Sequence, residues 1–293
     1  MTLAQYVASQ QQRVDEALER WVPRESTLPE SIHKAMRYSL FAGGKRVRPI
    51  LCMAAAEAVS DSPVGIESCA STLELIHTYS LIHDDLPALD NDDLRRGVPT
   101  CHKVFGDAIA ILAGDALLTL AFQVLAQMDC AADRKVALIE ELSTAAGTVG
   151  GMIGGQVCDL EGEGRHPDAA LLETIHRAKT GALLRASLRI GSIFAGAEPE
   201  QLRALSCYGE HVGLAFQIVD DVLDVEQSSE ALGKTAGKDA EQHKITFPAV
   251  YGLERSRQMA EEERLAAHLA LRPFDERAER LRELADFIVH RRA

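Results

Sequence analysis

The chain has 293 residues, enough to bury a large core as one big domain or two smaller ones. Its formal net charge of −13 argues against a nucleic-acid-binding surface, and no stripe rich in lysine and arginine contradicts this. The six cysteines are scattered without a CxxC pair, so zinc spacing is absent and a disulfide framework is improbable in a chain of this length.

Apolar residues recur at three- and four-residue spacing along most of the chain, which predicts helices. Alternating runs of Val, Ile and Thr are nearly absent, so a sheet is improbable. No Ser/Gly-rich linker and no shift in composition divides the chain. We therefore expect one all-α domain over residues 1–293, with helices at residues 3–21, 31–59, 65–83, 108–128, 134–158, 168–196, 200–225, 246–270 and 275–291.

Two segments bear on the location of the protein. The N-terminal stretch MTLAQYVASQQQRVDEALER is too polar for a signal peptide. The most apolar window, residues 108–126, carries Asp115 near its middle and Gln123 further along. Because a bilayer-spanning helix rarely tolerates a carboxylate at that depth, we expect a core helix, no transmembrane segment and a cytoplasmic protein.

The second expected segment contains GGKRVRP at residues 43–49. Lys45, Arg46 and Arg48 follow a diglycine and open a strongly apolar helix. Backbone amides at a helix N-terminus, together with basic side chains, can form a phosphate cradle. The pattern GxxxxGK[ST] does not occur, so this segment is not a Walker A loop.

The next helix runs directly into DDLPALDNDDLRRG at residues 84–97. Carboxylates that leave an apolar run lose part of their hydration, and like charges this close repel. In an ideal helix Asp84 and Asp90 would point about 120° apart. Pro87 disturbs the helix, so the chain can bring Asp90 back toward Asp84. The spacing excludes an EF-hand, and the neighbouring histidines lack the HExxH spacing of a zinc site.

Glycines recur at i, i+3, i+4, i+7 and i+8 in the segment GTVGGMIGGQVCDL. If this segment is helical, they form a bare stripe along one face, at a cost of about 1 kcal/mol each relative to alanine. Two interpretations stay open: close helix packing, which we favour, or room for a ligand tail with Gln156 and Asp159 at its polar end.

A second acidic cluster, FQIVDDVLDV, places Asp220, Asp221 and Asp224 at the end of another apolar helix. Asp220 and Asp224 lie within about 40° on one helix face. One such cluster is a weak signal, but two of them suit hard divalent cations. Mg²⁺ prefers oxygen ligands, keeps several waters and commonly bridges carboxylates to phosphate oxygens.

Basic residues accompany both acidic clusters, which suggests one phosphate bridged by metal and another held directly by arginine and lysine. These residues are Arg95, Arg96, Lys179 (followed by Thr180), Lys234, Lys238 and Lys244.

Taken together, these motifs resemble the trans-isoprenyl diphosphate synthase family, and within it the bacterial-type farnesyl diphosphate synthases. The resemblance covers nearly the whole chain, in the order and spacing of the family. The segments that carry it are GGKRVRP, IHTYSLIHDDLPALDNDDLRRGVPTCH, FGDAIAILAGDALLTLAF, GGQVCDLEGEG, HRAKTGALLRA, GLAFQIVDDVLDV, LGKTAGKD and KITFPAVYGLE. It implies an all-α, isoprenoid-synthase-like bundle around a central cavity, usually a homodimer.

The resemblance also implies the activity: Mg²⁺-dependent head-to-tail condensation of isopentenyl diphosphate with dimethylallyl and geranyl diphosphate. Three Mg²⁺ ions, which Mn²⁺ can replace, would be held on the allylic diphosphate by Asp84, Asp85, Asp90, Asp220 and, through water, Asp224. The same diphosphate would be gripped by Arg95, Lys179 and Lys234, with Lys244 nearby.

By the same resemblance, isopentenyl diphosphate would be bound by Gly44, Lys45, Arg48, His77 and Arg96. Gln217 and the backbone carbonyl of Thr180 would face the cation that develops on the allylic substrate. Released diphosphate would take the proton. Asp92 and Asp93 have no ligand role on this reading, and we expect them to pair with the arginines.

Product length is expected to depend on the helix that ends at Asp84. Ser80 lies about one turn, roughly 6 Å, before Asp84, and Tyr79 lies just beyond it. In the family, an aromatic residue at the fifth position before the first aspartate, with a small residue at the fourth, resembles the fifteen-carbon synthases. Tyr79 would then be the floor of the cavity, although it can equally be ordinary core.

Other activities stay open. A geranylgeranyl or geranyl diphosphate synthase is the alternative within prenyl transfer. A terpene cyclase should replace the second cluster with an Asn/Ser/Glu-type metal motif, whereas this chain has DDVLD there. A non-catalytic partner subunit or an acidic metal-binding module should carry lesions in an aspartate cluster or in the basic residues, and the sequence has none.

Overall fold

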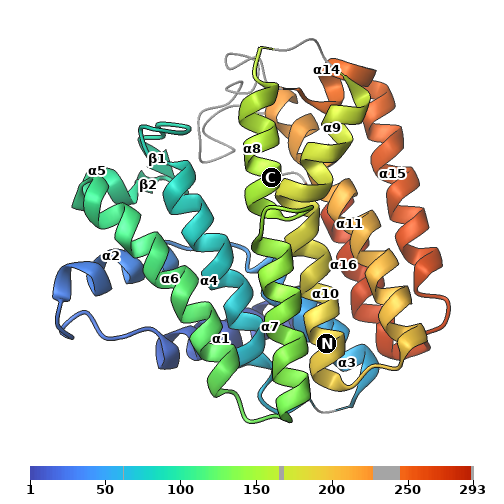
Figure 1. Ribbon diagram of the computed structural model, residues 1–293. Coiled ribbons are helices and arrows are strands. Elements are labelled where there is room, and N and C mark those ends of the chain that lie inside the picture. Colours follow the sequence, from blue (N-terminus) through green and yellow to red (C-terminus); the bar gives the residue numbers. More distant parts are fainter. Residues whose placement is uncertain (62, 165–167, 227–244, 292–293) are drawn as a thin grey trace. The chain divides into compact units, whose positions relative to one another are not determined.

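The computed structural model describes residues 1–61, 63–164, 168–226 and 245–291 (Figure 1). Helices make up nearly all the regular structure of these residues. The strands of the described part of the chain are two segments of two residues each, which form one hairpin. The all-α prediction is therefore confirmed. Lys234, Lys238 and Lys244, which the sequence places near a phosphate, lie outside the described residues.

The chain divides into two compact units. The first contains residues 1–50 and 65–135, and the second contains residues 51–64 and 136–293. The prediction of one domain over residues 1–293 stays a prediction.

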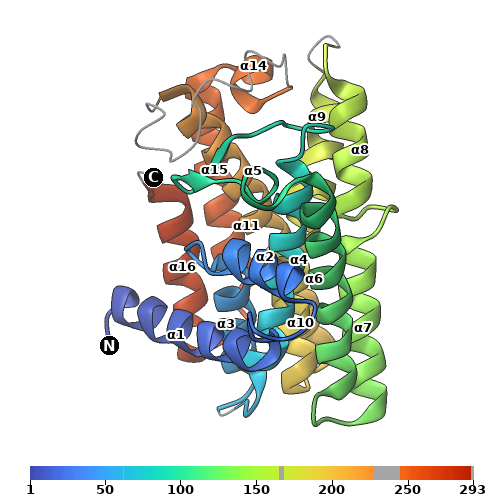
Figure 2. The same ribbon diagram turned by 90° about the vertical axis from the view of Figure 1, so that its left-hand side faces the viewer.

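The first unit is built on two long helices that pack against each other, α4 (Ile66–Asp84) and α6 (Asp107–Gln127), which lie side by side in both views (Figures 1 and 2). Around them lie α1 (Leu3–Trp21), α2 (Glu30–Leu40), α5 (Cys101–Phe105) and the hairpin of β1 (Leu94–Arg95) and β2 (Val98–Pro99). Twelve of the nineteen residues of α4 are buried. That burial explains its apolar sequence.

Helix α6 is long and apolar enough to cross a membrane by length and composition. This is weak support for a span, because core helices of soluble proteins pass the same test. The buried stripe of α6 includes Ala113, Leu117, Ala121 and Val124, at the spacing of a packed helix face. This packing agrees with the core helix that the sequence predicts.

The predicted helix 31–59 is two helices, α2 and α3 (Val47–Val59). The intervening loop contains Gly43 and Gly44 at φ +92° and +125°, and Arg46 at φ +51°. A right-handed helix cannot pass through three residues with positive φ. Hydrophobic spacing does not show this break, because the apolar pattern continues on both sides of it.

The predicted helix 134–158 is also broken, into α7 (Ala132–Ala146) and α8 (Met152–Gly162). Gly150 has φ +67°, and a Cβ on Gly154 would stand 1.9 Å from the carbonyl oxygen of Thr148. Most of the expected stripe is therefore a tight turn. Gly155 does serve close packing, since its Cβ would stand 2.1 Å from the backbone nitrogen of Lys179.

The predicted helix 168–196 is continuous but contains one π-helical turn. It comprises α9 (Ala169–His176), the π turn η1 (Arg177–Gly181) and α10 (Ala182–Ala195). π turns occur mostly as single insertions in α-helices, often at functional sites. Here the turn contains Lys179 and Thr180, two of the residues that the family resemblance assigns to catalysis along with Gln217 and Arg95.

The rest of the second unit packs around α11 (Pro199–Glu226), which contacts both α10 and α15 (Leu253–Ala270). The buried hydroxyl of Tyr208 on α11 donates to the carbonyl oxygen of Leu281 at 2.6 Å, which ties α11 to α16 (Glu279–His290). The short helices α14 (Phe247–Tyr251) and η2 (Glu276–Ala278) complete the unit. Its core at the C-terminal end of α11 comprises Leu172, Ile218, Val219, Val222, Ile245, Phe247 and Ala260.

Candidate functional site

The first acidic cluster sits in a tight turn after α4. The helix ends at Asp84, and the backbone amide of Asp90 donates to the carbonyl oxygen of Asp84 at 2.8 Å. The amide of Asp92 donates to the carbonyl oxygen of Asp85 at 3.2 Å. The chain therefore folds back after Pro87, as its sequence predicts, and brings the backbone of Asp90 against that of Asp84.

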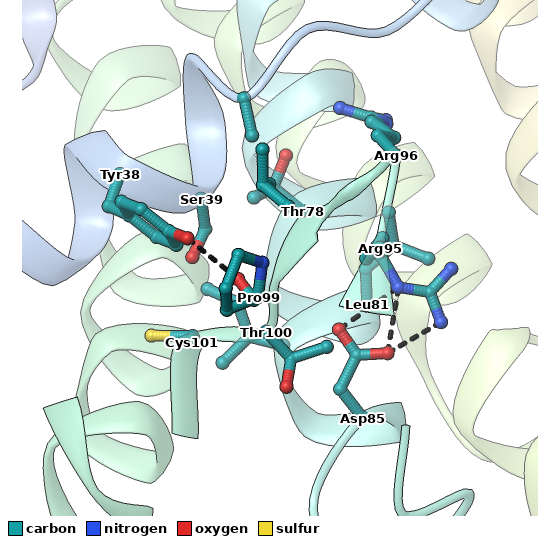
Figure 3. Close-up of a pocket in the computed structure, with 13 residues that line it drawn as sticks. Tyr38, Ser39, Thr78, Leu81, Asp85, Arg95, Arg96, Pro99, Thr100 and Cys101 are labelled. Carbon is teal, nitrogen blue, oxygen red and sulfur yellow. Dashed lines mark hydrogen bonds and ion pairs between the residues drawn. The ribbon is translucent and has the colours of Figure 1, made fainter. Parts of the chain in front are cut away.

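Asp85 and Arg95 form a close pair at the edge of this turn (Figure 3). Nε of Arg95 donates to both carboxylate oxygens of Asp85, at 2.7 and 3.0 Å, and Nη2 lies 2.6 Å from Oδ1. The Asp85 side chain is only 5% exposed. Burial raises the pKa of this carboxyl, and the hydrogen bond and positive charge of Arg95 oppose that shift.

We expected Asp92 and Asp93 to pair with the neighbouring arginines. Oδ2 of Asp92 lies 3.5 Å from Nη2 of Arg95, so Asp92 does partner an arginine. Asp93 pairs with Lys103 at 2.7 Å, with 74% of its side chain exposed, and an arginine partner for Asp93 stays a prediction.

The β1–β2 hairpin places Arg96 against the loop between α2 and α3 that contains Gly43 and Gly44. Arg96 and Gly97 both have positive φ, +54° and +78°, as a two-residue type I′ turn requires. Arg96 donates to the carbonyl oxygen of Gly43, and a Cβ on Gly44 would stand 2.7 Å from the Arg96 guanidinium carbon. Glycine at position 44 is therefore needed for Arg96 to lie against the loop. The structure thus brings together Gly44 and Arg96, which were both predicted to bind isopentenyl diphosphate.

The basic residues of the first unit surround His77. Burial lowers the pKa of His77 well below its ordinary value, and the positive charges of Arg48, Arg96 and Arg95 lower it further. These arginines therefore form a basic cluster near His77 in the first unit. Arg46 departs from the expected phosphate cradle, because its side chain is buried and points into the protein.

The second acidic cluster divides its three carboxylates between different partners. Asp221 accepts from the side-chain amide of Gln217 at 2.8 Å and from the backbone amide of Phe247 at 2.9 Å, so both of its oxygens serve the protein. Asp220 accepts from Arg291, whose guanidinium also stacks over Phe216 at 4.0 Å. Asp224 is buried, with 7% of its surface exposed.

The π turn presents its two predicted residues to neighbouring helices. Nζ of Lys179 donates to Asp159 of α8 at 2.6 Å, and Oγ1 of Thr180 donates to Oε1 of Gln217 at 2.8 Å. Thr180 and Gln217, which the resemblance assigns to the same task, are therefore in contact. The sequence places Asp221 only in the acidic cluster that suits divalent cations and does not show that its side chain orients Gln217.

His176 is a further residue that sequence reasoning missed. It is buried, lies 3.5 Å from Oδ2 of Asp221 through its Nε2 atom, and stacks on Phe247 with ring centroids 5.2 Å apart. Burial lowers its pKa to about 4; the charge of Asp159 opposes this shift and that of Lys179 adds to it. In the sequence, only its place at the start of HRAKTG, three residues before Lys179, could have drawn attention to it.

The predicted product-length residues lie on α4 one turn before Asp84. Tyr79 is 5% exposed, and its hydroxyl has no hydrogen-bond partner in the described part of the chain. Its ring meets the His83 ring edge to face at 5.8 Å. Burial and the nearby charge of Asp84 raise the pKa of Tyr79 to about 12. Ser80 donates to the carbonyl oxygen of His77 at 2.8 Å.

The arrangement of the carboxylates suits a Mg²⁺ ion that is shared with a substrate phosphate better than a metal ion that is coordinated only by protein side chains. Among the described residues, no group of three His, Cys, Asp or Glu side chains is arranged to hold a metal ion. Mg²⁺ does not need such a cage, because it keeps waters and shares phosphate oxygens with one or two carboxylates. An all-oxygen donor set next to arginine and lysine suits Mg²⁺ that arrives with a diphosphate.

Comparisons with known proteins identify the family of this chain. The family model described as polyprenyl synthetase matches residues 29–286. A dimethylallyltranstransferase of Fischerella ambigua is 49% identical over 99% of this chain and 84% of the relative. A farnesyl diphosphate synthase of Geobacillus stearothermophilus is 46% identical over 92% of this chain and 89% of the relative. The large subunit 1 of a heterodimeric geranylgeranyl pyrophosphate synthase of Arabidopsis thaliana is 47% identical over 98% and 78%.

Similar solved structures are also named for more than one product. An FPP/GFPP synthase from Zymomonas mobilis superposes with a TM-score of 0.88 at 36% identity, covering 98% of each chain. A geranylgeranyl pyrophosphate synthetase from Pyrococcus horikoshii superposes with a TM-score of 0.89 at 31% identity, covering 99% of this chain and 98% of the other.

Proposed function

The chain belongs to the polyprenyl synthetase family and is a prenyltransferase, and from this premise we propose that it makes farnesyl diphosphate. It would condense isopentenyl diphosphate first with dimethylallyl diphosphate and then with geranyl diphosphate. The observation that carries the fifteen-carbon product is Tyr79, a buried aromatic side chain one turn before Asp84 on α4. A tyrosine at this depth would block further growth of the hydrocarbon chain.

A twenty-carbon product is the alternative that the relatives leave open, because a geranylgeranyl synthase matches this chain as closely as the farnesyl synthase does. Residue 79 separates the two proposals. A geranylgeranyl synthase would need a cavity that extends past this position, and the Tyr79 ring would close such a cavity here.

The proposed mechanism needs divalent metal, and we propose Mg²⁺ at Asp84, Asp85 and Asp90 and at Asp220 and Asp224. When bound, this metal neutralises the departing diphosphate and so favours cleavage of the allylic C–O bond. Arg95 and Lys179 add fixed positive charge where the leaving group becomes more negative. Lys234 and Lys244 are proposed to act with them.

The second substrate, isopentenyl diphosphate, would occupy an anion site among the basic residues around His77. Gly44, Lys45, Arg48 and Arg96 would bind its diphosphate. The positive charges of Arg48 and Arg96 near His77, and the close approach of Arg96 to Gly44, support the proposal. The isopentenyl double bond then attacks the allylic cation, and released diphosphate takes the proton. The Gln217 amide and the Thr180 carbonyl would face the cation as it develops.

We also propose that the protein is a homodimer. Two helices carry exposed apolar side chains that a partner subunit could cover: Ile111 and Leu112 on α6, and Val157 and Leu160 on α8. Exposed apolar groups at helical spacing are typical of interfaces. The cytoplasmic location expected from the sequence stays a prediction.

The test is incubation of the protein with labelled isopentenyl diphosphate and each allylic primer, with and without EDTA, followed by chromatography of the products. Metal-dependent formation of a fifteen-carbon diphosphate supports the proposal. A dominant twenty-carbon product would remove the farnesyl assignment alone. Absence of any chain extension in the presence of Mg²⁺ would overturn the catalytic role.

A further inference from the structure

The loop between α2 and α3 is anchored by one buried arginine. The side chain of Arg46 donates to Oε1 of Glu74 on α4 at 2.8 Å, to Oδ1 of Asp15 on α1 at 3.0 Å, and to the carbonyl oxygen of Leu40 at 2.8 Å. Its side chain is 3% exposed and that of Glu74 is 2% exposed. One residue therefore ties the loop to three separate parts of the first unit.

The contacts of the Arg46 side chain hold a backbone conformation that is otherwise unfavourable. Arg46 has φ +51°, a region that residues with a Cβ rarely adopt and that persists only when the surroundings hold it. Its carbonyl oxygen accepts from the amide of Ile50 at 3.1 Å, the first hydrogen bond that leads into α3. Fixing Arg46 therefore fixes where α3 begins and, with it, the position of Arg48.

The residues beside the anchor are held at two further points. The side-chain amide of Gln11 on α1 donates to the carbonyl oxygen of Lys45 at 3.1 Å, and Arg96 donates to that of Gly43. The Lys45 side chain itself is exposed. The loop thus has a rigid backbone and an outward-facing lysine.

Glu74 also links this loop to the anion site along α4. Positions 74 and 77 are three residues apart, so Glu74 and His77 lie on one face of the helix. Through Arg46, the face of α4 that carries His77 sets the position of the loop that carries Lys45 and Arg48.

We propose that Arg46 and Glu74 are positioning residues for isopentenyl diphosphate. They do not contact the substrate; they hold Lys45 and Arg48 in place for its diphosphate. This inference rests on the proposed function, which assigns Lys45 and Arg48 to that diphosphate. Exact placement of binding groups matters because small displacements weaken charged contacts strongly.

The variant must separate a positioning role of Arg46 and Glu74 from a purely structural role. Buried ion pairs often contribute little net stability, and their replacement by apolar residues of similar volume is frequently neutral or stabilising. Removing one partner alone strands a buried charge and destabilises the fold. The informative variant therefore replaces both partners, R46M together with E74M, so that the fold is retained while the anchor is lost.

The experiment measures kcat and KM for isopentenyl diphosphate and for geranyl diphosphate, together with the melting temperature. For the double variant we expect KM for isopentenyl diphosphate to rise by about tenfold or more, equivalent to about 1.4 kcal/mol. KM for geranyl diphosphate should stay near that of the wild type. Lys45→Ala, which removes a proposed direct contact, should raise the same KM.

The matched control replaces both partners of another pair, Glu141→Met together with Arg189→Met. Glu141 pairs with Arg189 at 2.8 Å in the second unit, and the loss of this pair should leave both KM values unchanged. If the wild type extends no substrate, the proposed function itself fails. If the wild type extends and Lys45→Ala raises KM, but the double variant keeps the wild-type KM or changes both KM values equally, the positioning role is overturned.

Discussion

Asp221 fixes the orientation of the Gln217 side chain four residues earlier on α11. Its Oδ1 accepts from Nε2 of Gln217 at 2.8 Å, which leaves the amide oxygen of Gln217 to accept from Thr180 at 2.8 Å. Oδ2 of Asp221 accepts from the backbone amide of Phe247. Because both carboxylate oxygens have protein donors, the middle aspartate of DDVLD serves Gln217 rather than acting as an evident metal ligand.

Replacement of Asp221 by asparagine should therefore impair the chemical step. The asparagine amide can accept with one atom only, so either Gln217 or the Phe247 amide faces a donor. Leaving one such buried group unsatisfied costs about 1–3 kcal/mol. We expect a single-turnover rate at least about tenfold lower, measured by rapid quench. Asp221→Glu is no substitute control, because it adds a methylene to a buried site.

The contradicting outcome is a single-turnover rate equal to that of the wild type in a variant whose folded state is intact by circular dichroism. In that case the hydrogen bond to Gln217 would be dispensable for catalysis, and only its stabilising effect would remain.

Tyr79 gives the sharpest test of product length. Tyr79→Ala should lengthen the products, because it removes the buried ring one turn before Asp84. Truncating a buried aromatic costs about 3–5 kcal/mol, so product analysis should be run well below the melting temperature. Chromatography of the dephosphorylated products measures the outcome, and an unchanged fifteen-carbon product would refute the floor role.

Tyr79→Phe is the matched control for this experiment. The Tyr79 hydroxyl has no partner in the described part of the chain, so its removal costs no hydrogen bond there. The ring, which would block growth, is kept. We expect unchanged product length and stability no lower than that of the wild type.

The sequence predicts the acidic turn better than the loops. The end of α4 and the return of Asp90 follow from Pro87, whose effect on the backbone is local. The helix breaks at Gly43 and Gly150 depend on positive φ. Glycine permits positive φ, but the presence of glycine in a sequence does not show that its φ is positive. The contact of Arg291 with Asp220 joins residues 71 apart in the chain, and nothing in local pattern indicates such a pair.

Asp84→Ala should abolish activity and leave the fold intact. The turn uses the backbone carbonyl of Asp84, which alanine retains, and the substitution removes repulsion between neighbouring carboxylates. Product formation and melting temperature are the two measurements. Asp93→Ala is the matched control, because this exposed aspartate pairs with Lys103 at the surface and such pairs contribute about 0–1 kcal/mol. Equal activity of the two variants would contradict a ligand role for Asp84.

His176 should make the protein less stable in mild acid. Its pKa is about 4 in the folded state, whereas an unfolded histidine titrates near 6.5, so the unfolded chain binds the proton first as pH falls. The stability it contributes is complete above about pH 6.5 and is lost between there and about pH 4, by up to about 3 kcal/mol. Urea unfolding at several pH values measures this slope. His176→Gln should show a shallower slope over the same interval, and a slope identical to that of the wild type would show that His176 does not titrate on unfolding.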